Sequence, residues 1–253
     1  MTDGQRPRLI QLSDHSLRFP APSQAHPSGL LAVGGDLSAE RLVAAYAQGI
    51  FPWFGEDDPL LWWSPDPRCV FVTSATRPHR RFARSLRQSR WSLSVDCAFA
   101  QVIAACAAPT TGRMGTWLTP AMQKAYTTLH QRGHAHSFEV WDGTRLVGGL
   151  YGVASGGVFS GESMFSVESG GSKVALYAAC RTLASWGMPL LDAQVANAHT
   201  LGLGAIQIPR AAFLHALRDL ADARTPQDWN AELPVRRATD LAFPPGSGSA
   251  PSR

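Results

Sequence analysis

Lysine is almost missing from this 253-residue chain, and so are the cysteine and histidine patterns that hold metals. Lys124 and Lys173 are the only lysines among 23 basic residues, so arginine carries nearly all of the positive charge. The four cysteines show no CxxC spacing, and there is no HExxH pattern. This argues against a zinc site and favours reduced, buried thiols. We therefore expect a protein without a bound metal.

The sequence also lacks an apolar run long enough to cross a bilayer, and its first residues, MTDGQRPRL, are polar. Neither a membrane span nor a secretory signal is indicated, so a cytoplasmic protein is expected. Hydrophobic residues make up 45% of the chain, which is typical of a globular protein. We expect an N-terminal domain over residues 1–66, a second domain over residues 67–240, and a disordered tail over residues 241–253.

One stretch, Val158–His199, combines polar residues with strongly apolar surroundings. It reads as a strand with Glu162, a glycine turn, a helix, and a second strand with Asp192 and Gln194. Strand alternation predicts that Asp192 and Gln194 share one face of the sheet. Polar side chains inside an apolar strand are costly unless they are hydrogen-bonded or used. Spacing alone leaves a structural pair and a catalytic pair equally open.

The segment from residue 50 to residue 68 holds a dense aromatic cluster in which prolines 52, 59, 65 and 67 disfavour a helix. One interpretation is a hydrophobic plug between two domains. The other is a set of flat faces on which a nucleobase stacks. The cluster consists of Phe51, Trp53, Phe54, Trp62 and Trp63.

The segment Thr76–Ser89, TRPHRRFARSLRQS, has no acidic residue. On a helix, Phe82 and Leu86 would face inward. The opposite stripe would be purely basic, whereas solvated faces usually mix charges, and this favours phosphate binding over simple solvation. The stripe consists of Arg77, Arg80, Arg84 and Arg87.

The order of the expected elements suggests a fold. Strands are expected at 92–96, 137–141, 145–153, 158–165, 190–195 and 205–208, and helices at 98–107, 120–132, 172–186 and 211–220. This α+β order is that of GNAT-type acyltransferases. The fold has a mixed, largely antiparallel sheet flanked by helices, here preceded by a small N-terminal α/β domain. Two of its strands splay apart to hold the acyl group. The pyrophosphate signature of coenzyme A enzymes is not clean in this chain.

Several long motifs show a resemblance to a known family. They include GLLAVGGDLS (29–38), AYAQGIFPWF (45–54), LWWSPDPR (61–68), FSGESMFS (159–166) and LLDAQVANAHTLGLGA (190–205). In these stretches the chain resembles the leucyl/phenylalanyl-tRNA–protein transferases, which have a GNAT-like fold.

The resemblance implies that Leu or Phe, and less readily Met, moves from its tRNA to proteins beginning with Arg or Lys. The new peptide bond would mark the acceptor for degradation. No metal and no other cofactor is implied, and a monomer is expected. The arginine stripe would bind tRNA phosphates, and Trp53, Trp117 and Glu162 would surround the 3′-terminal adenosine. The residues implied for the aminoacyl side-chain pocket are Leu150, Phe159, Met164, Leu176, Leu183 and Leu191.

Asp192 and Gln194 match the catalytic pair that has been proposed for the family. We expect Asp192 to hold Gln194, and one of the two to receive the attacking amine. Two other functions remain open at this point. An acetyl-CoA acetyltransferase would not need the arginine stripe, and a non-catalytic RNA-binding module would leave Asp192 and Gln194 unused.

Overall fold

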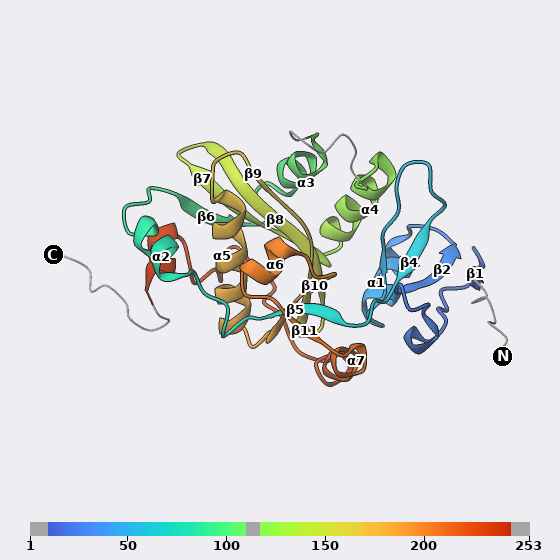
Figure 1. The fold of residues 1–253 in the computed structure, drawn as a ribbon. Helices are drawn as coiled ribbons and strands as arrows, with labels where there is room; N and C mark the ends of the chain where they lie inside the picture. Colours follow the sequence, from blue (N-terminus) through green and yellow to red (C-terminus); the bar gives the residue numbers. More distant parts are fainter. Residues whose placement is uncertain (1–9, 110–116, 244–253) are drawn as a thin grey trace.

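A computed structural model describes residues 10–109 and 117–243 (Figure 1). A small sheet lies at one end of the molecule, a large sheet occupies the middle, and helix α2 with the C-terminal segment lies at the other end. Within the described ranges no helix has the length and hydropathy that a bilayer span needs. Cys97 is exposed, whereas Cys69, Cys106 and Cys180 are buried as expected.

The small sheet has the strand order β1-β2-β4-β3. β1 runs parallel to β2, and the other two pairs are antiparallel. Helix α1 begins after Ser38, whose side chain accepts a hydrogen bond from the backbone of Arg41, as an N-cap does. The elements are β1 (Ile10–Leu12), β2 (Leu30–Gly34), α1 (Ala39–Tyr46), β3 (Phe51–Pro52) and β4 (Leu61–Trp63).

The large sheet has the strand order β11-β5-β10-β9-β8-β7-β6. Only the β10–β9 pair is parallel, so the expected mixed, largely antiparallel sheet is confirmed. Its strands are β5 (Arg68–Val72), β6 (Ser92–Val95), β7 (Ala135–Asp142), β8 (Arg145–Ser155), β9 (Val158–Ser166), β10 (Leu190–Gln194) and β11 (Ile206–Ile208).

Helices cover both faces of the large sheet. They are α2 (Arg80–Leu86), α3 (Phe99–Ala107), α4 (Pro120–Gln131), α5 (Gly171–Ser185), α6 (Ala198–Gly202) and α7 (Arg210–Asp219). The large sheet has a hydrophobic core on each face. Successive side chains of β8 point into different cores, because side chains alternate along a strand. Leu150 packs in the core that contains α5, and Tyr151 packs in the core that contains α3, α4 and the small sheet.

Helix α5 begins against the backbone of β8. A Cβ placed on Gly148 would lie 2.4 Å from the carbonyl carbon of Gly171, and a Cβ placed on Gly171 would lie 2.4 Å from the carbonyl oxygen of Val147, so both positions need glycine. Gly171 therefore serves the packing of α5 on β8, whereas Gly170, with φ 94°, serves the turn before the helix.

The C-terminal segment also belongs to the core. Trp229 is 3% exposed and stacks on His136 with 3.6 Å between the ring centroids. Leu241 is buried within the short helix Ala238–Ala242. Of the tail expected from residue 241, residues 244–253 lie outside the described ranges. The expected domain limits at residues 66, 67 and 240 stay a prediction.

Candidate functional site

A cavity of about 310 Å³ opens where β9 and β10 separate. The two strands pair from Leu190 and Val158 up to Asp192 and Ser160, and β9 then continues to Ser166 paired only with β8. Where β9 and β10 no longer pair, the side chains along their facing edges border the cavity. The acyl cleft was expected between these two strands. The cavity is lined by Phe51, Pro52, Trp53, Phe71, Trp117, Leu150, Gly161, Glu162, Ser163, Met164, Leu176, Leu191, Ala193, Gln194, Val195, Asn197 and Thr200.

Gln194 reaches this cavity because β10 is irregular at its end. The register against β5 shifts between Asp192 and Gln194, and Gln194 has φ 57°, in the left-handed region that non-glycine residues rarely occupy. Gln194 lines the cavity together with Leu191 and Ala193, whereas Asp192 does not. The prediction that Asp192 and Gln194 share a face by regular alternation is therefore wrong: a β-bulge turns Gln194 toward the cavity.

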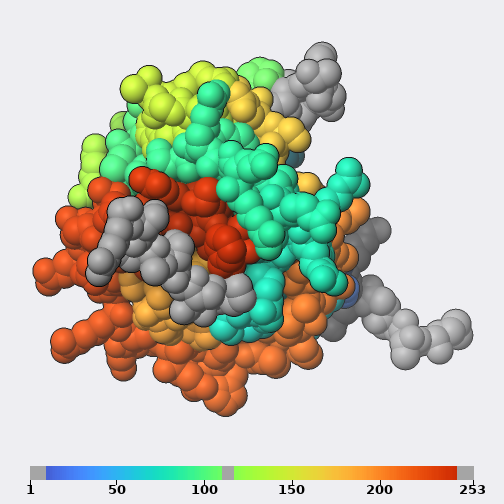
Figure 2. All heavy atoms as spheres, turned by 90° about the vertical axis from the view of Figure 1, so that its left-hand side faces the viewer, coloured from blue at the N-terminus to red at the C-terminus, as the bar shows by residue number. Residues whose placement is uncertain are grey.

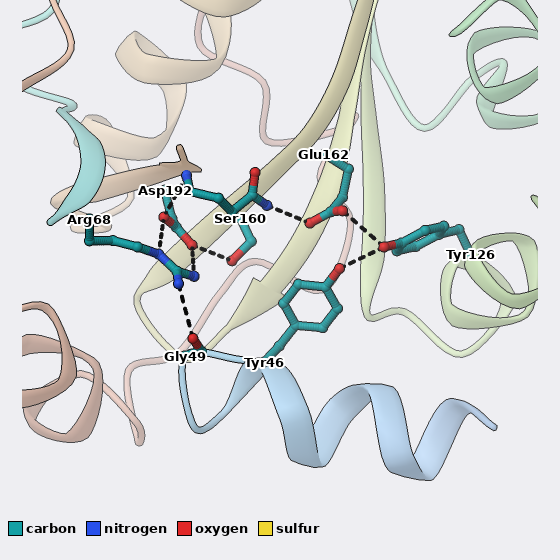
Figure 3. A network of polar contacts seen from close by, with 8 residues as sticks. Tyr46, Gly49, Arg68, Tyr126, Ser160, Glu162 and Asp192 are labelled. Carbon is teal, nitrogen blue, oxygen red and sulfur yellow. Dashed lines mark hydrogen bonds and ion pairs between the residues drawn. The ribbon is translucent and has the colours of Figure 1, made fainter. Parts of the chain in front are cut away.

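Asp192 is fully buried and pairs with Arg68 (Figure 3). Arg68 Nε lies 2.8 Å from one carboxylate oxygen, and Nη2 lies 2.7 Å from the other. Ser160 Oγ and the backbone N–H of Gln194 donate to the same carboxylate, at 3.3 Å and 3.0 Å. Asp192 thus holds Gln194, as expected, through the backbone of Gln194.

Glu162 is the only ionisable side chain among the described residues that line the cavity. Its two oxygens accept hydrogen bonds from Gln194 Nε2 at 2.8 Å and from the Tyr126 hydroxyl at 2.9 Å. The Tyr126 hydroxyl also lies 2.7 Å from that of Tyr46, and Figure 3 shows both rings directed toward Glu162. Burial raises the pKa of Glu162 to about 7, against the opposing effect of the two tyrosine hydroxyls.

The bond to Glu162 fixes the orientation of the Gln194 amide. Because the NH₂ group donates to a carboxylate, the carbonyl oxygen of the same amide is left as an acceptor. The site thus combines one neutral acceptor and one carboxylate of raised pKa, which can orient an amine and take up its proton.

Two tryptophans lie at the rim of the cavity. Trp53 is 44% exposed and packs edge-on against Trp63, and Trp117 packs edge-on against Tyr126. The structure therefore brings Trp53, Trp117 and Glu162 together around one opening, although they come from three distant parts of the chain. Exposed aromatic faces of this kind suit base stacking.

The apolar part of the cavity contains four of the six residues expected in the side-chain pocket. These are Leu150, Met164, Leu176 and Leu191. Phe159 and Leu183 do not line the cavity. Phe159 packs against Phe138 and Trp229, and Leu183 is fully buried in the core around α5. Phe51, Phe71, Ala193 and Val195 line the cavity but were not expected there.

The arginine stripe lies on a separate face. Figure 2 shows α2 beside the C-terminal segment on this side of the molecule. Phe82 and Leu86 face inward as expected, and Arg80, Arg84 and Arg87 are exposed. Arg77 is exposed too, but it precedes the helix, which begins only at Arg80. Within the described ranges none of these four arginines forms an ion pair with a carboxylate.

The sequence patterns gave no sign of Arg68, Tyr46 and Tyr126. A basic residue at the start of an apolar strand, Arg68–Val72, was the only available signal for Arg68, since a buried arginine needs a buried partner. Among the described residues, no group of three or more His, Cys, Asp or Glu side chains is arranged to hold a metal ion.

Comparison with known proteins gives one consistent result. A family model described as leucyl/phenylalanyl-tRNA protein transferase matches residues 70–218, and the model of the N-terminal domain of that family matches residues 35–66. A leucyl/phenylalanyl-tRNA–protein transferase of Xanthomonas axonopodis pv. citri is 56% identical over 233 residues, which cover 90% of this chain and 94% of the relative. A protein of the same name from Nitratidesulfovibrio vulgaris is 50% identical over 230 residues, covering 88% and 98%.

Proposed function

The chain belongs to the leucyl/phenylalanyl-tRNA protein transferase family and is an aminoacyltransferase, and from this premise we propose its acceptor and its cellular role. The donor is an aminoacyl-tRNA carrying Leu or Phe, and less readily Met. The acceptor is the α-amine of a protein that begins with Arg or Lys. The new N-terminal residue marks that protein for degradation in the cytoplasm.

The observation that supports this proposal is that the cavity has an apolar part and a polar part. Its apolar part contains Leu150, Met164, Leu176 and Leu191. Its polar part contains the hydrogen-bonded pair Glu162 and Gln194 close to the end of β10, together with Ser163, Asn197 and Thr200. An apolar slot takes an unbranched-Cβ side chain such as Leu or Phe and discriminates by about 1–3 kcal/mol per methylene. The ester carbonyl of the same aminoacyl group then lies at the polar part.

The tRNA is held at two places in this proposal. Trp53 and Trp117 stack on the 3′-terminal adenine at the rim, with Glu162 beside them. The acceptor-stem phosphates lie on Arg77, Arg80, Arg84 and Arg87, whose exposed guanidinium groups lack carboxylate partners among the described residues.

The chemistry requires one proton acceptor. The neutral α-amine attacks the ester carbon, so a C–N bond forms and the bond to the ribose oxygen breaks. Gln194 accepts a hydrogen bond from the amine and orients it. Glu162 takes the proton released by the nitrogen and returns it to the ribose oxygen, which leaves as a hydroxyl. A pKa of about 7 suits this exchange, because an α-amine has a pKa near 8.

The test of the proposal is transfer of labelled Leu from tRNA to peptides that differ only in the first residue. Peptides beginning with Arg or Lys should be modified, and a peptide beginning with Ala should not. Equal transfer to all three would refute the proposed acceptor specificity. Stabilisation of the protein by acetyl-CoA would instead support a coenzyme A-dependent acetyltransferase.

A further inference from the structure

Asp192 has no face open to a substrate. It is completely buried and absent from the lining of the cavity. Four donors occupy its carboxylate: two groups of Arg68, the hydroxyl of Ser160 and the backbone N–H of Gln194. A carboxylate has about four acceptor positions, so none is left for an amine. Asp192 therefore acts through other residues.

Arg68 joins three separate parts of the chain at this point. Its side chain is 1% exposed, and its guanidinium carbon lies 4.9 Å from the centroid of the Phe51 ring and 4.6 Å from that of the Phe213 ring. Its third nitrogen, Nη1, donates to the carbonyl of Gly49 at 3.0 Å. The planar, forked shape of arginine makes these contacts possible at once, and lysine cannot reproduce them.

The contacts of Arg68 with Asp192, Gly49 and Phe51 lead to groups at the cavity. Through Asp192 it supports the N–H of Gln194, whose φ of 57° is an unfavourable conformation that the surroundings must hold. Through Gly49 and Phe51 it fixes the start of the segment that ends in Trp53, and both Phe51 and Trp53 line the cavity. One buried side chain thus sets the distance between the amide that orients the amine and the tryptophan at the rim.

We propose that Arg68 is a positioning residue for the transfer reaction, acting through Asp192 on Gln194 and through Gly49 and Phe51 on the segment that carries Trp53. Asp192 is a positioning residue of the same device and does not exchange a proton with the substrate. This inference rests on the transfer reaction proposed above, adds Arg68 to its machinery, and limits Asp192 to positioning Gln194.

The first test is Arg68→Lys, which keeps the buried charge and thereby favours folding. It should lower kcat at least tenfold at saturating substrates, with a smaller change in KM for tRNA, and leave the shape of the pH–rate profile unchanged. A kcat within threefold of the wild type would overturn the proposal.

A double-mutant cycle tests whether Arg68 and Asp192 act together on Gln194 or contribute to the reaction independently. Arg68→Met and Asp192→Asn should each lower kcat about 100-fold, and the double variant should be no slower than the worse single one, because both act on Gln194. Reductions that multiply to about 10⁴-fold would show that Asp192 contributes to the chemistry on its own and would refute the shared device.

The chain offers a matched control in a second buried arginine. Arg41 is also fully buried and pairs with Asp36 at 3.2 Å, but neither residue lines the cavity. Arg41→Met should lower Tm as Arg68→Met does, and should keep the wild-type kcat below its Tm. Equal reductions of kcat in Arg41→Met and Arg68→Met would show that Arg68 only stabilises the fold, and would overturn the proposal. Absence of transfer by the wild type would instead refute the proposed function.

Discussion

Replacing Glu162 by Gln tests the chemistry of the cavity through both stability and rate. Burial raises the pKa of this carboxyl from its ordinary value of 4.5 to about 7. The folded protein therefore favours the protonated form, whereas the unfolded chain ionises near pH 4.5. The stability that the protonated group contributes is complete below pH 4.5 and is lost as the pH rises through 7.

The size of this effect follows from the difference between the two pKa values. One pKa unit corresponds to about 1.4 kcal/mol, so the free energy of unfolding of the wild type should fall by up to about 3 kcal/mol relative to Glu162→Gln between pH 4.5 and pH 8. Gln keeps the shape of the side chain and cannot ionise. The stability of the variant should thus change less than that of the wild type between pH 4.5 and pH 8.

Urea denaturation of both proteins at pH 5, 6, 7 and 8 measures this difference. A stability difference that stays constant over that range would refute the raised pKa. In transfer assays the kcat of the same variant should fall by about 10²–10⁴, since it cannot accept the proton. Glu139→Gln is the matched control. Burial also raises the pKa of Glu139, which contacts Ser94 and Ser137 outside the cavity, so this variant should share the pH-dependent stability change and keep its kcat.

Three further changes probe the tRNA, the adenosine and the side-chain pocket. Arg80→Ala with Arg84→Ala should raise KM for tRNA and reduce the salt slope of binding by about 0.7–0.9 for each phosphate that is no longer neutralised. Arg218→Ala, on α7, is the control, and an unchanged slope in the double variant would exclude α2 as the tRNA-binding element. Trp53→Ala should weaken tRNA binding by about 1–3 kcal/mol, with partial recovery in Trp53→Phe. Leu176→Phe should narrow the cavity and lower kcat/KM for Phe more than for Leu, and an unchanged ratio would argue against this pocket.

Local patterns were sufficient for the elements that are long and regular. The expected strand at 145–153 is β8 (Arg145–Ser155), and the expected helix at 172–186 is α5 (Gly171–Ser185). Both are long and rich in apolar residues, and both are buried over most of their length. β5 was missed because it is a five-residue strand directly after a run of prolines, and its partners β10 and β11 lie far along the chain.

The sequence allowed us to predict only those site residues that lie in recognisable motifs and whose side chains suit base stacking or proton transfer. The cavity collects Trp53, Trp117, Glu162 and Gln194, as the motif resemblance implied. The pair of Arg68 and Asp192 joins residues 124 positions apart, and the contact between Tyr46 and Tyr126 spans 80 positions. No periodicity reports such pairs. The first arises when β5 pairs with β10 in the large sheet, and the second arises when α1 packs against α4. The bulge at Gln194 likewise depends on the neighbouring strand, and alternation within β10 could not reveal it.

We propose that the cavity is where an amino acid from tRNA is joined to the α-amine of a basic N-terminal residue. Mass spectrometry of a peptide beginning with Arg, after incubation with Leu-tRNA and the protein, tests it most directly. We expect a peptide longer by one leucine at its N-terminus, and no product from the same peptide with an acetylated α-amine. Leucine attached to a side chain, or to the acetylated peptide, would contradict it.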